Sequence, residues 1–357
     1  MRRLTYDTAV RFDAMQIEAL RHRLRALGAR PVHEERVLRQ WSRAESQAHG
    51  RRRPEDFLPL SLRTALPALE AELRALAVLR ADHCGADGSR RLLVGLADGR
   101  SVEAVLLPRG GLCVSSQVGC AVGCVFCMTG LGGLERQLGS AEIVAQVALA
   151  RSLRQVTKVV FMGMGEPAHN LDAVLEAIDL LGTGGGIGHK QLVLSTVGDR
   201  RLFERLPHGR VKPALALSLH STDAALRARL LPRAPPIAPE ELVALGDAYA
   251  RATGYPMQVQ WTLLEGINDK ADEIEGLVRL LAGKLAVLNL IPYNTVDGLA
   301  LARPAAERSR AMVHELQRRG ILTKLRQSAG QEVQAGCGQL RARHESGAKR
   351  RIQIAPA

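Results

Sequence analysis

The amino-acid sequence predicts an α/β protein whose main domain is an open or partly closed barrel of six parallel strands. From about residue 139 onward, each short apolar run rich in β-branched residues is followed by a longer helical pattern, and alternation of this kind forms parallel sheets. The 357-residue chain is 46% hydrophobic, which suits one large domain with an accessory piece. The predicted strands are 157–162, 190–195, 213–219, 256–263, 285–291 and 321–326, and the predicted helices are 140–153, 171–182, 198–206, 223–231, 239–252, 270–283 and 304–319.

Two further units precede the barrel. Apolar residues at helical spacing predict helices over 15–29, 35–47 and 56–76, the last of them broken at Pro67. Two β-rich runs joined across an Asp-Gly turn predict a hairpin, with strands at 91–97 and 102–107. The resulting division is a helical, RNA-binding accessory domain at 1–80, a β-hairpin extension at 81–112, a barrel core at 113–340 and a basic tail at 341–357.

The positive charge lies in the two flanks of the chain. The net charge is +13, yet positions 113–302 hold seventeen basic and eighteen acidic residues. The flanks hold twenty basic against fourteen acidic residues at 1–112, and twelve against four at 303–357. Basic flanks around a neutral middle indicate binding of a polyanion such as nucleic acid. The alternative is compositional bias, since only seven of the forty-nine basic residues are lysine.

Composition also excludes several classes of protein. A disordered chain would be less apolar, a disulfide scaffold would be denser in cysteine, and no apolar run reaches the roughly twenty residues of a membrane-spanning helix. Arg2 and Arg3 are followed by polar residues and not by the apolar segment of a signal peptide, so a cytoplasmic protein is expected. In a reducing compartment the six cysteines are expected to act as ligands or catalysts.

Three of these cysteines predict an iron–sulfur cluster. Cys120, Cys124 and Cys127 are separated by three and then two residues, and this spacing lets three thiolates hold a 4Fe-4S cluster and leave one iron without a protein ligand. A structural zinc site is the main alternative, but no second pair of ligands follows at a suitable distance. Buried structural cysteines are a weaker alternative, because glycines surround them on an expected loop.

An open iron beside a (β/α) barrel suits S-adenosylmethionine, whose amino and carboxylate groups can chelate it before reductive cleavage to a radical. The segment Phe161 to Pro167 supports this interpretation, because the first barrel strand ends there in a glycine turn that carries Glu166. In such barrels the chemistry collects where strands end. The polar residues at those ends are Glu166, Ser195, Thr196, Ser218, His220, Asn268 and Asn294.

Several segments together resemble the radical SAM RNA adenine methyltransferases of the RlmN/Cfr type, over almost the whole chain. The resemblance implies a partial (β/α)6 radical SAM barrel with a small helical N-terminal domain and a short β extension. The matching segments are 112–120, 161–167, 194–196, 217–221, 289–294 and 336–340. The first and last are the most specific, because they carry Cys113 and Cys337, which other radical SAM enzymes lack.

The resemblance implies a role for each site residue. Cys337 would accept a methyl group from one S-adenosylmethionine, and a radical made from a second molecule would activate that S-methyl group. Cys113 would be the thiol that releases the product by attacking Cys337, which would leave a disulfide, and Glu103 would accept the ring proton. Cys120, Cys124 and Cys127 would bind the cluster, and Gly165, Glu166, Ser195, Ser218, Leu219, His220 and Asn294 would contact S-adenosylmethionine.

The implied reaction is methylation of an adenine ring carbon in RNA, with carbon 2 favoured over carbon 8. Both carbons are electron-poor, so they cannot attack a sulfonium methyl group, whereas a radical on a methylene group can add to them. Ribosomal RNA is the first expected substrate and transfer RNA the second. The resemblance further implies an external one-electron donor such as flavodoxin, a monomer, and no membrane.

Two alternatives stay open at this point. One is a diverged radical SAM enzyme with another substrate, and the other is an RNA-binding protein whose cluster is structural. The second leaves Cys113 and Cys337 without a purpose. The segment from Ser328 to Gly336 departs from the acidic stretch usual in the family, which puts the substrate in question. Cys84 matches no motif and has no expected role.

Overall fold

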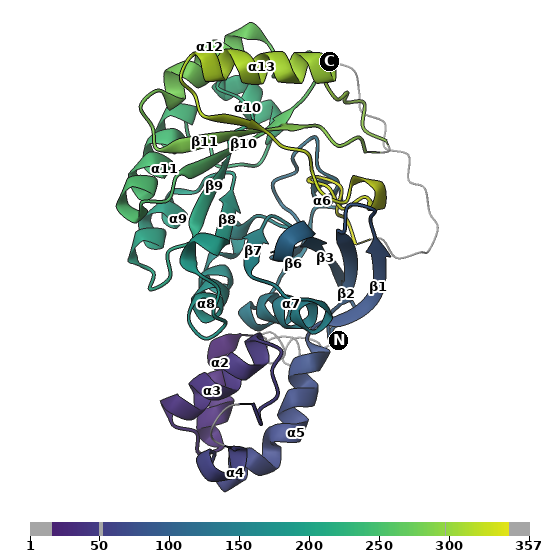
Figure 1. Cartoon of the computed structure of the whole chain (residues 1–357), viewed down its shortest axis with the longest axis vertical. Helices are drawn as coiled ribbons and strands as arrows, with labels where there is room; N and C mark the ends of the chain where they lie inside the picture. The colour runs from purple at the N-terminus through teal and green to yellow at the C-terminus, as the bar shows by residue number, and fades with distance from the viewer. Residues whose placement is uncertain (1–15, 50–52, 297, 343–357) are drawn as a thin grey trace, which may run out of the picture.

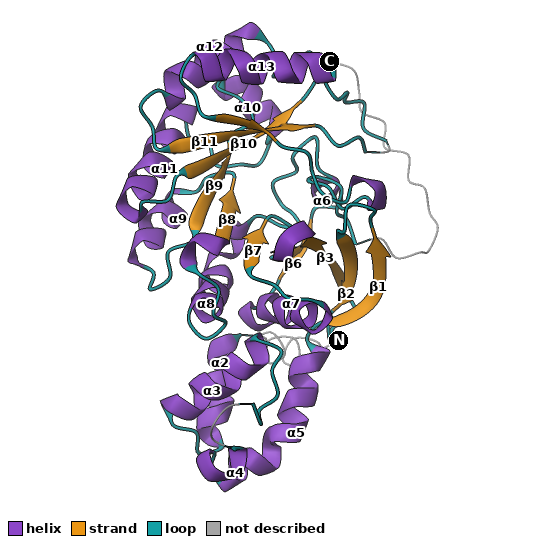
Figure 2. Ribbon diagram, viewed as in Figure 1, coloured by secondary structure: helices purple, strands orange, loops and turns teal. Residues whose placement is uncertain are grey.

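A computed structural model describes residues 16–49, 53–296 and 298–342 (Figure 1). Its main feature is a mixed sheet of ten strands in the order β1-β2-β3-β4-β7-β8-β9-β10-β11-β12. The outermost strands, β1 and β12, do not pair with each other, so the sheet curves without closing into a barrel (Figure 2). The predicted α/β class with a partly open barrel is therefore confirmed.

Seven neighbouring strands of this sheet run parallel. They are β4 (Gly111–Cys113), β7 (Lys158–Phe161), β8 (Leu192–Thr196), β9 (Ala214–Ser218), β10 (Met257–Leu263), β11 (Ala286–Pro292) and β12 (Thr323–Leu325). The last six confirm the predicted strands. β4 was not predicted, because three residues that begin with glycine carry too little periodicity. This strand matters because its carboxyl end leads directly toward the cysteine loop.

The helices predicted between the strands are also present. They are α7 (Ser140–Leu153), α8 (Leu171–Gly182), α9 (Arg200–Arg205), α10 (Ala224–Leu230), α11 (Pro239–Thr253), α12 (Ala271–Leu281) and α13 (Ala306–Arg318). Figure 2 shows α8, α9, α11, α12 and α13 around the outer side of the curved sheet. Leu192 and Leu194 are buried and line neither of two cavities on the concave side, whereas Val193, also buried, lines one of them and Ser195 lines the other.

An antiparallel extension continues the sheet beyond β4. It consists of β1 (Val78–Cys84), β2 (Arg90–Gly95) and β3 (Ser101–Leu107). The predicted hairpin corresponds to β2 and β3. The edge strand β1 was not predicted, because its side chains are exposed or half-buried and show no clear apolar alternation. Cys84 lies at its exposed end.

A second, two-stranded sheet frames the cysteine loop. It pairs β5 (Gln117–Gly119) with β6 (Leu134–Gln137), and the short helix α6 (Met128–Leu131) lies between them in the chain.

The N-terminal helices form a lobe below α7 in Figure 1. They are α2 (Ile17–Ala26), α3 (Pro31–Ser42), α4 (Pro54–Phe57) and α5 (Leu60–Ala75). The expected break at Pro67 is wrong, because α5 runs through this residue. Its stripe of buried leucines, from Leu62 to Leu73, packs in the core and holds the helix together despite the lost backbone hydrogen bond. The backbone N–H of Ile17 donates to Ser140 Oγ at 2.8 Å and ties the lobe to α7.

The predicted basic tail lies outside the described residues except for Arg341 and Ala342. Within the described part of the chain, no helix is both long enough and apolar enough to cross a bilayer.

Candidate active site

The three clustered cysteines lie on a loop between β5 and β6. The backbone N–H of Cys120 donates to the carbonyl of Gly133 at 2.9 Å. Gly119, the residue before, has a φ of 77°, and a Cβ there would lie 2.0 Å from the Gly133 oxygen. Only glycine fits at this position, so the turn fixes where the loop begins.

All three cysteines line one cavity of about 160 Å³, called here the small cavity. Burial raises the pKa of Cys120 to about 12 and that of Cys124 well above its usual value. Without a metal, Cys120 and Cys124 are therefore neutral thiols, and bound iron would be needed to hold these two as thiolates. Among the described residues, no group of three His, Cys, Asp or Glu side chains is arranged to hold a single metal ion.

A glycine turn after β7 carries Glu166 into the small cavity. Gly165 has a φ of 104°, and a Cβ there would lie 2.6 Å from the Gln117 side chain. Glu166 Oε1 accepts a hydrogen bond from the Ala168 N–H and Oε2 accepts one from the Val197 N–H, both at 3.0 Å. Burial raises the pKa of Glu166, although these hydrogen bonds favour the carboxylate. The turn presents a fixed carboxyl group that suits an ammonium ligand.

Two further strands contribute hydroxyl and imidazole groups to the same cavity. Ser195 Oγ and Ser218 Oγ lie 3.4 Å apart near the ends of β8 and β9. His220 has a φ of 63°, and its Nδ1 accepts a hydrogen bond from the Thr262 N–H at 2.9 Å. Burial lowers the pKa of His220 to about 3, so the ring is neutral and carries its proton on Nε2. Nε2 is thus available as a hydrogen-bond donor.

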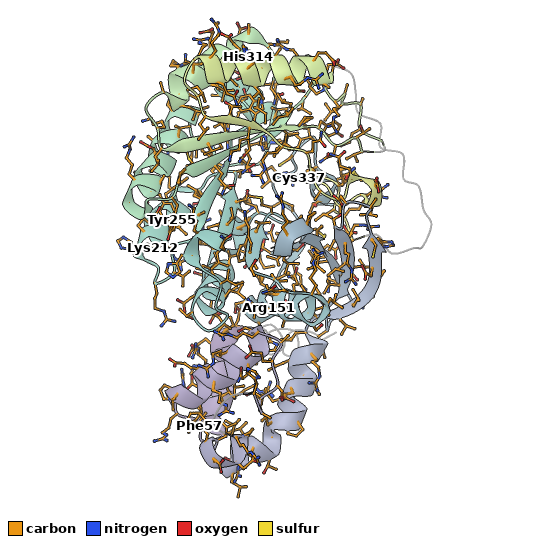
Figure 3. All side chains as sticks on the ribbon, in the orientation of Figure 1. Phe57, Arg151, Lys212, Tyr255, His314 and Cys337 are labelled. Atoms are coloured by element: carbon orange, nitrogen blue, oxygen red, sulfur yellow. The ribbon has the colours of Figure 1, made fainter. Side chains whose placement is uncertain are left out.

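A second cavity of about 650 Å³, called here the large cavity, adjoins the small one. Cys127 and Cys337 line both cavities, and Cys113 lines the large one. Figure 3 shows Cys337 on the concave side of the sheet, away from the outer helices. The accessible surface of Cys337 faces these cavities, and its confinement there raises the pKa of the thiol. A hydrogen bond with Ser328 and the charge of Arg326 oppose that rise.

Cys113 and Cys337 are far apart in the sequence and close in the fold. Burial raises the pKa of Cys113 to about 12, and repulsion from Cys337 adds to the rise. Both sulfurs are free thiols, without the disulfide that the sequence analysis expected at one stage of the reaction.

The loop that carries Cys337 is held against the cysteine loop. The backbone N–H of Met128 donates to the carbonyl of Gly338 at 2.7 Å. The Thr129 hydroxyl donates to the carbonyl of Leu340 at 2.6 Å. These contacts seat the C-terminal segment beside the expected cluster ligands.

Comparison with known proteins identifies the family. A model of the radical SAM superfamily matches residues 114–281. A probable RNA methyltransferase of Methylibium petroleiphilum is 72% identical over 96% of this chain and 97% of its own length. The chain belongs to the radical SAM methyltransferase family. A probable RNA methyltransferase of Pseudomonas aeruginosa is 64% identical over 95% of this chain and 99% of its own length. The crystal structure of a radical SAM methyltransferase from Sphaerobacter thermophilus superposes with a TM-score of 0.78, at 33% identity over 92% of this chain and 98% of that one.

The radical SAM family implies a 4Fe-4S cluster and S-adenosylmethionine as cofactors. The donor chemistry of this chain fits both groups. Three thiols on one loop share the small cavity with a carboxyl group, two hydroxyls and a neutral imidazole. These are the predicted residues Cys120, Cys124, Cys127, Gly165, Glu166, Ser195, Ser218 and His220.

Two predicted cofactor contacts of this radical SAM methyltransferase lie elsewhere. Leu219 is fully buried, lines neither cavity, and donates its backbone N–H to the carbonyl of Gln260 at 3.1 Å. Asn294 also lines neither cavity. Its Nδ2 donates to the carbonyl of Cys337 at 3.0 Å and to Ser328 Oγ at 2.8 Å. In this structure Asn294 therefore positions the Cys337 loop.

The predicted proton acceptor, Glu103, is buried on β3 and lines neither cavity. Its Oε1 pairs with the guanidinium of Arg91, and its Oε2 accepts a hydrogen bond from the Arg341 N–H at 2.8 Å. It thus contacts the segment that follows the cavity-lining Leu340.

Arg227 on α10 was not predicted from the sequence as a site residue. This residue is 4% exposed, and its guanidinium donates to the carbonyl of Val197, beside the Glu166 turn. Burial lowers the pKa of Arg227 to about 10, and attraction to Cys124 and Glu166 opposes that fall. The signal in the sequence is a charged residue three positions before Leu230, on the buried face of a short helix.

Proposed function

We propose that this radical SAM methyltransferase acts on RNA and methylates a ring carbon of adenine, with carbon 2 favoured over carbon 8. The observation that carries the proposal is the shared cavity of Cys337, Cys113 and the cluster-loop residue Cys127. The relatives named probable RNA methyltransferases and the two basic flanks support RNA as the substrate. Ribosomal RNA is the first candidate and transfer RNA the second.

In the proposed reaction Cys337 takes a methyl group from S-adenosylmethionine by displacement. Its thiolate must form first, and the Ser328 hydroxyl and the Arg326 charge favour that form against burial. When bound, the cluster and a second S-adenosylmethionine would supply the radical chemistry that activates the S-methyl group. Cys337 is seated between the two cavities, so it can face the cofactor on one side and RNA on the other.

Addition of the activated carbon to adenine would attach the RNA to Cys337 and leave one unpaired electron on the adduct, which the oxidised cluster, when bound, would accept. Glu103 is proposed to accept the ring proton, and its contact with Arg341 links it to the Cys337 segment. The sulfur of Cys113, once deprotonated, would then attack the sulfur of Cys337. The bond between Cys337 sulfur and the methylene carbon would break, its electron pair and a proton would convert that carbon to the methyl group of the product, and a disulfide would join the two cysteines.

The enzyme would also need an electron donor and a supply of S-adenosylmethionine. An external one-electron donor such as flavodoxin would reduce the cluster, and two molecules of S-adenosylmethionine would be used per turnover. A cytoplasmic location is part of the proposal, because a reducing compartment keeps cluster-binding thiols available, and so is the monomeric state that the family resemblance implies.

Two measurements test this function. Protein reconstituted with iron and sulfide without oxygen should show 4Fe-4S absorption and form 5′-deoxyadenosine from S-adenosylmethionine. Mass spectrometry of RNA from strains with and without the gene should then locate one methyladenosine that depends on it. If 5′-deoxyadenosine forms but the adenosine profile is unchanged, the enzyme acts on another substrate. The non-acidic segment from Ser328 to Gly336 is compatible with that alternative.

A further inference from the structure

The large cavity is lined by positively charged side chains as well as by cysteines. Lys158, Arg326 and Arg109 line it together with Cys113 and Cys337. Lys158 is the first residue of β7 and is half-buried, Arg326 directly follows β12, and Arg109 lies in the turn between β3 and β4. Three separate parts of the fold therefore bring cations to the wall of one cavity.

These cations have no acidic partner in the part of the chain that the structure describes. Within the described residues, no ion pair involves Arg109, Lys158 or Arg326. The Arg326 side chain makes one long hydrogen bond, from Nη1 to Asn289 Oδ1 at 3.4 Å. Burial and repulsion from Arg326 lower the pKa of Lys158, so the two cations are close enough to destabilise each other.

Asp87 is the acidic side chain that lines the large cavity, and its oxygens are already occupied. Oδ1 accepts hydrogen bonds from the N–H and hydroxyl of Ser89, and Oδ2 accepts one from the Gly330 N–H at 2.8 Å. Asp87 therefore serves the local turns, and the half-buried Lys158 and the exposed Arg109 and Arg326 make no ion pair with it.

Arg109 is held in a costly backbone conformation. It has a φ of 61° and a ψ of 39°, a left-handed conformation that is unfavourable for a residue with a side chain. Pro108 precedes it and Gly110 follows with a φ of 75°. Strain of this kind persists where the surrounding structure fixes a residue in place, and it is common at ligand sites.

We propose that Lys158 and Arg326, with Arg109 at the edge, bind a phosphodiester group of the substrate RNA while its adenine lies beside Cys337. This inference rests on the proposed function and adds a binding site to it. A phosphate would supply the missing counter-charge. Contacts with the RNA backbone would position the nucleotide and leave its base free for chemistry. The charge of Arg326 lowers the pKa of Lys158 and opposes the rise in the pKa of Cys337, so Arg326 lies near both residues. One nucleotide could therefore contact the cations with its phosphate and the Cys337 sulfur with its base.

The test measures RNA binding and not turnover. The probe is a short, fluorescein-labelled single-stranded RNA with one adenosine, and anisotropy is recorded over a series of salt concentrations. In the variant Lys158→Gln with Arg326→Gln, affinity should fall roughly tenfold at low salt, and the salt slope should become shallower by about 1. The unfolding midpoint should stay the same or rise, because two repelling charges are gone.

The matched control is Arg310→Gln with Arg318→Gln on α13, which removes the same charge from exposed positions outside both cavities. A second set of probes carries a neutral methylphosphonate at each linkage near the adenosine in turn. At one linkage the neutral group should weaken binding to the wild type but not to the Lys158/Arg326 variant. Equal losses in the cavity variant and the control, or additive losses at every linkage, would overturn the inference and leave the proposed function standing. A wild-type protein that binds no RNA would overturn both.

Discussion

Asn294 holds the backbone of Cys337, because its Nδ2 donates a hydrogen bond to the Cys337 carbonyl at 3.0 Å. The same nitrogen donates to Ser328 Oγ at 2.8 Å, so one amide joins the reactive loop to the hydroxyl that favours the Cys337 thiolate. A Cβ on Gly336 would lie 2.8 Å from this nitrogen, so the approach is close. Loop position and thiol chemistry therefore depend on one side chain.

Asn294→Asp should release this loop. The substitution replaces a donor by an oxygen that repels the Cys337 carbonyl, and each lost hydrogen bond contributes about 1 kcal/mol. Cys337 is already exposed, and the new carboxylate and the loss of the ordered Ser328 hydroxyl both raise the pKa of its thiol. Alkylation of Cys337 in cluster-free protein, followed by mass spectrometry, should therefore become roughly tenfold slower. Cys84 is exposed and serves as an internal reference, whose rate should not change. An unaltered Cys337 rate would show that the amide does not hold the loop.

Cys113→Ala should trap RNA on the enzyme. The variant keeps Cys337 and the small cavity but removes the thiol proposed to release the product. Labelled RNA should then stay attached to the protein on a denaturing gel, and product release should stop. Cys84→Ala is the matched control, since Cys84 lines neither cavity, and it should turn over like the wild type. Normal release by Cys113→Ala would remove this residue from the mechanism.

His220 should make the protein less stable in acid. Its folded-state pKa is about 3, so below the usual value near 6.5 the unfolded chain binds a proton that the folded chain excludes. The free energy of unfolding should therefore fall as the pH drops from 6.5, by at most about 1.4 kcal/mol per pH unit from this group. His220→Asn should lose that component, measured by urea unfolding of cluster-free protein at several pH values.

Two variants distinguish the contribution of the His220 ring to stability from that of its backbone conformation. Asparagine tolerates the φ of 63° and can accept the Thr262 hydrogen bond, so His220→Asn should keep its stability at neutral pH. Valine is branched at Cβ and accepts no hydrogen bond, so His220→Val should be destabilised at every pH. If wild type and His220→Asn show the same pH dependence, the buried neutral imidazole is contradicted.

Arg227→Met should lower the midpoint potential of the reconstituted cluster. Arg227 is a buried cation that interacts with Cys124 and Glu166, and a nearby positive charge favours the reduced, more negative cluster. Removing it should shift the potential by about −50 mV, which corresponds to about 1 kcal/mol for a one-electron couple. Potentiometry followed by electron paramagnetic resonance measures the shift. The exposed Arg229, on the same helix, offers the matched control Arg229→Met, and equal potentials in both variants would contradict the prediction.

Much of the barrel could be predicted from the sequence because its elements are local patterns. The bounds predicted for α7 and α8 coincide with the observed helices, and all six predicted strands are present. The elements missed were β1 and β4, a half-exposed edge strand and a three-residue strand. Their pairing is decided by neighbouring strands and leaves little periodicity in the chain.

The site residues also fall into two groups, those set by the local chain and those set by tertiary contacts. Spacing alone indicated Cys120, Cys124 and Cys127, because ligands on one loop are set by the local chain. Sequence could not show that Asn294 holds the Cys337 loop, that Glu103 is paired with Arg91, or that Arg227 is buried beside Glu166. Each of these depends on contacts between segments far apart in the chain.

The sequence by itself determined the fold class, the cysteine loop and the Glu166 turn, because short-range steric and periodic rules govern them. Only the tertiary structure decided which groups share a cavity. The curvature of the sheet brings Cys113, at the end of β4, to the Cys337 loop beyond β12, and it places Lys158 and Arg326 along the same wall. Burial then changes their chemistry, since a thiol or an amine removed from water no longer titrates at its usual pH.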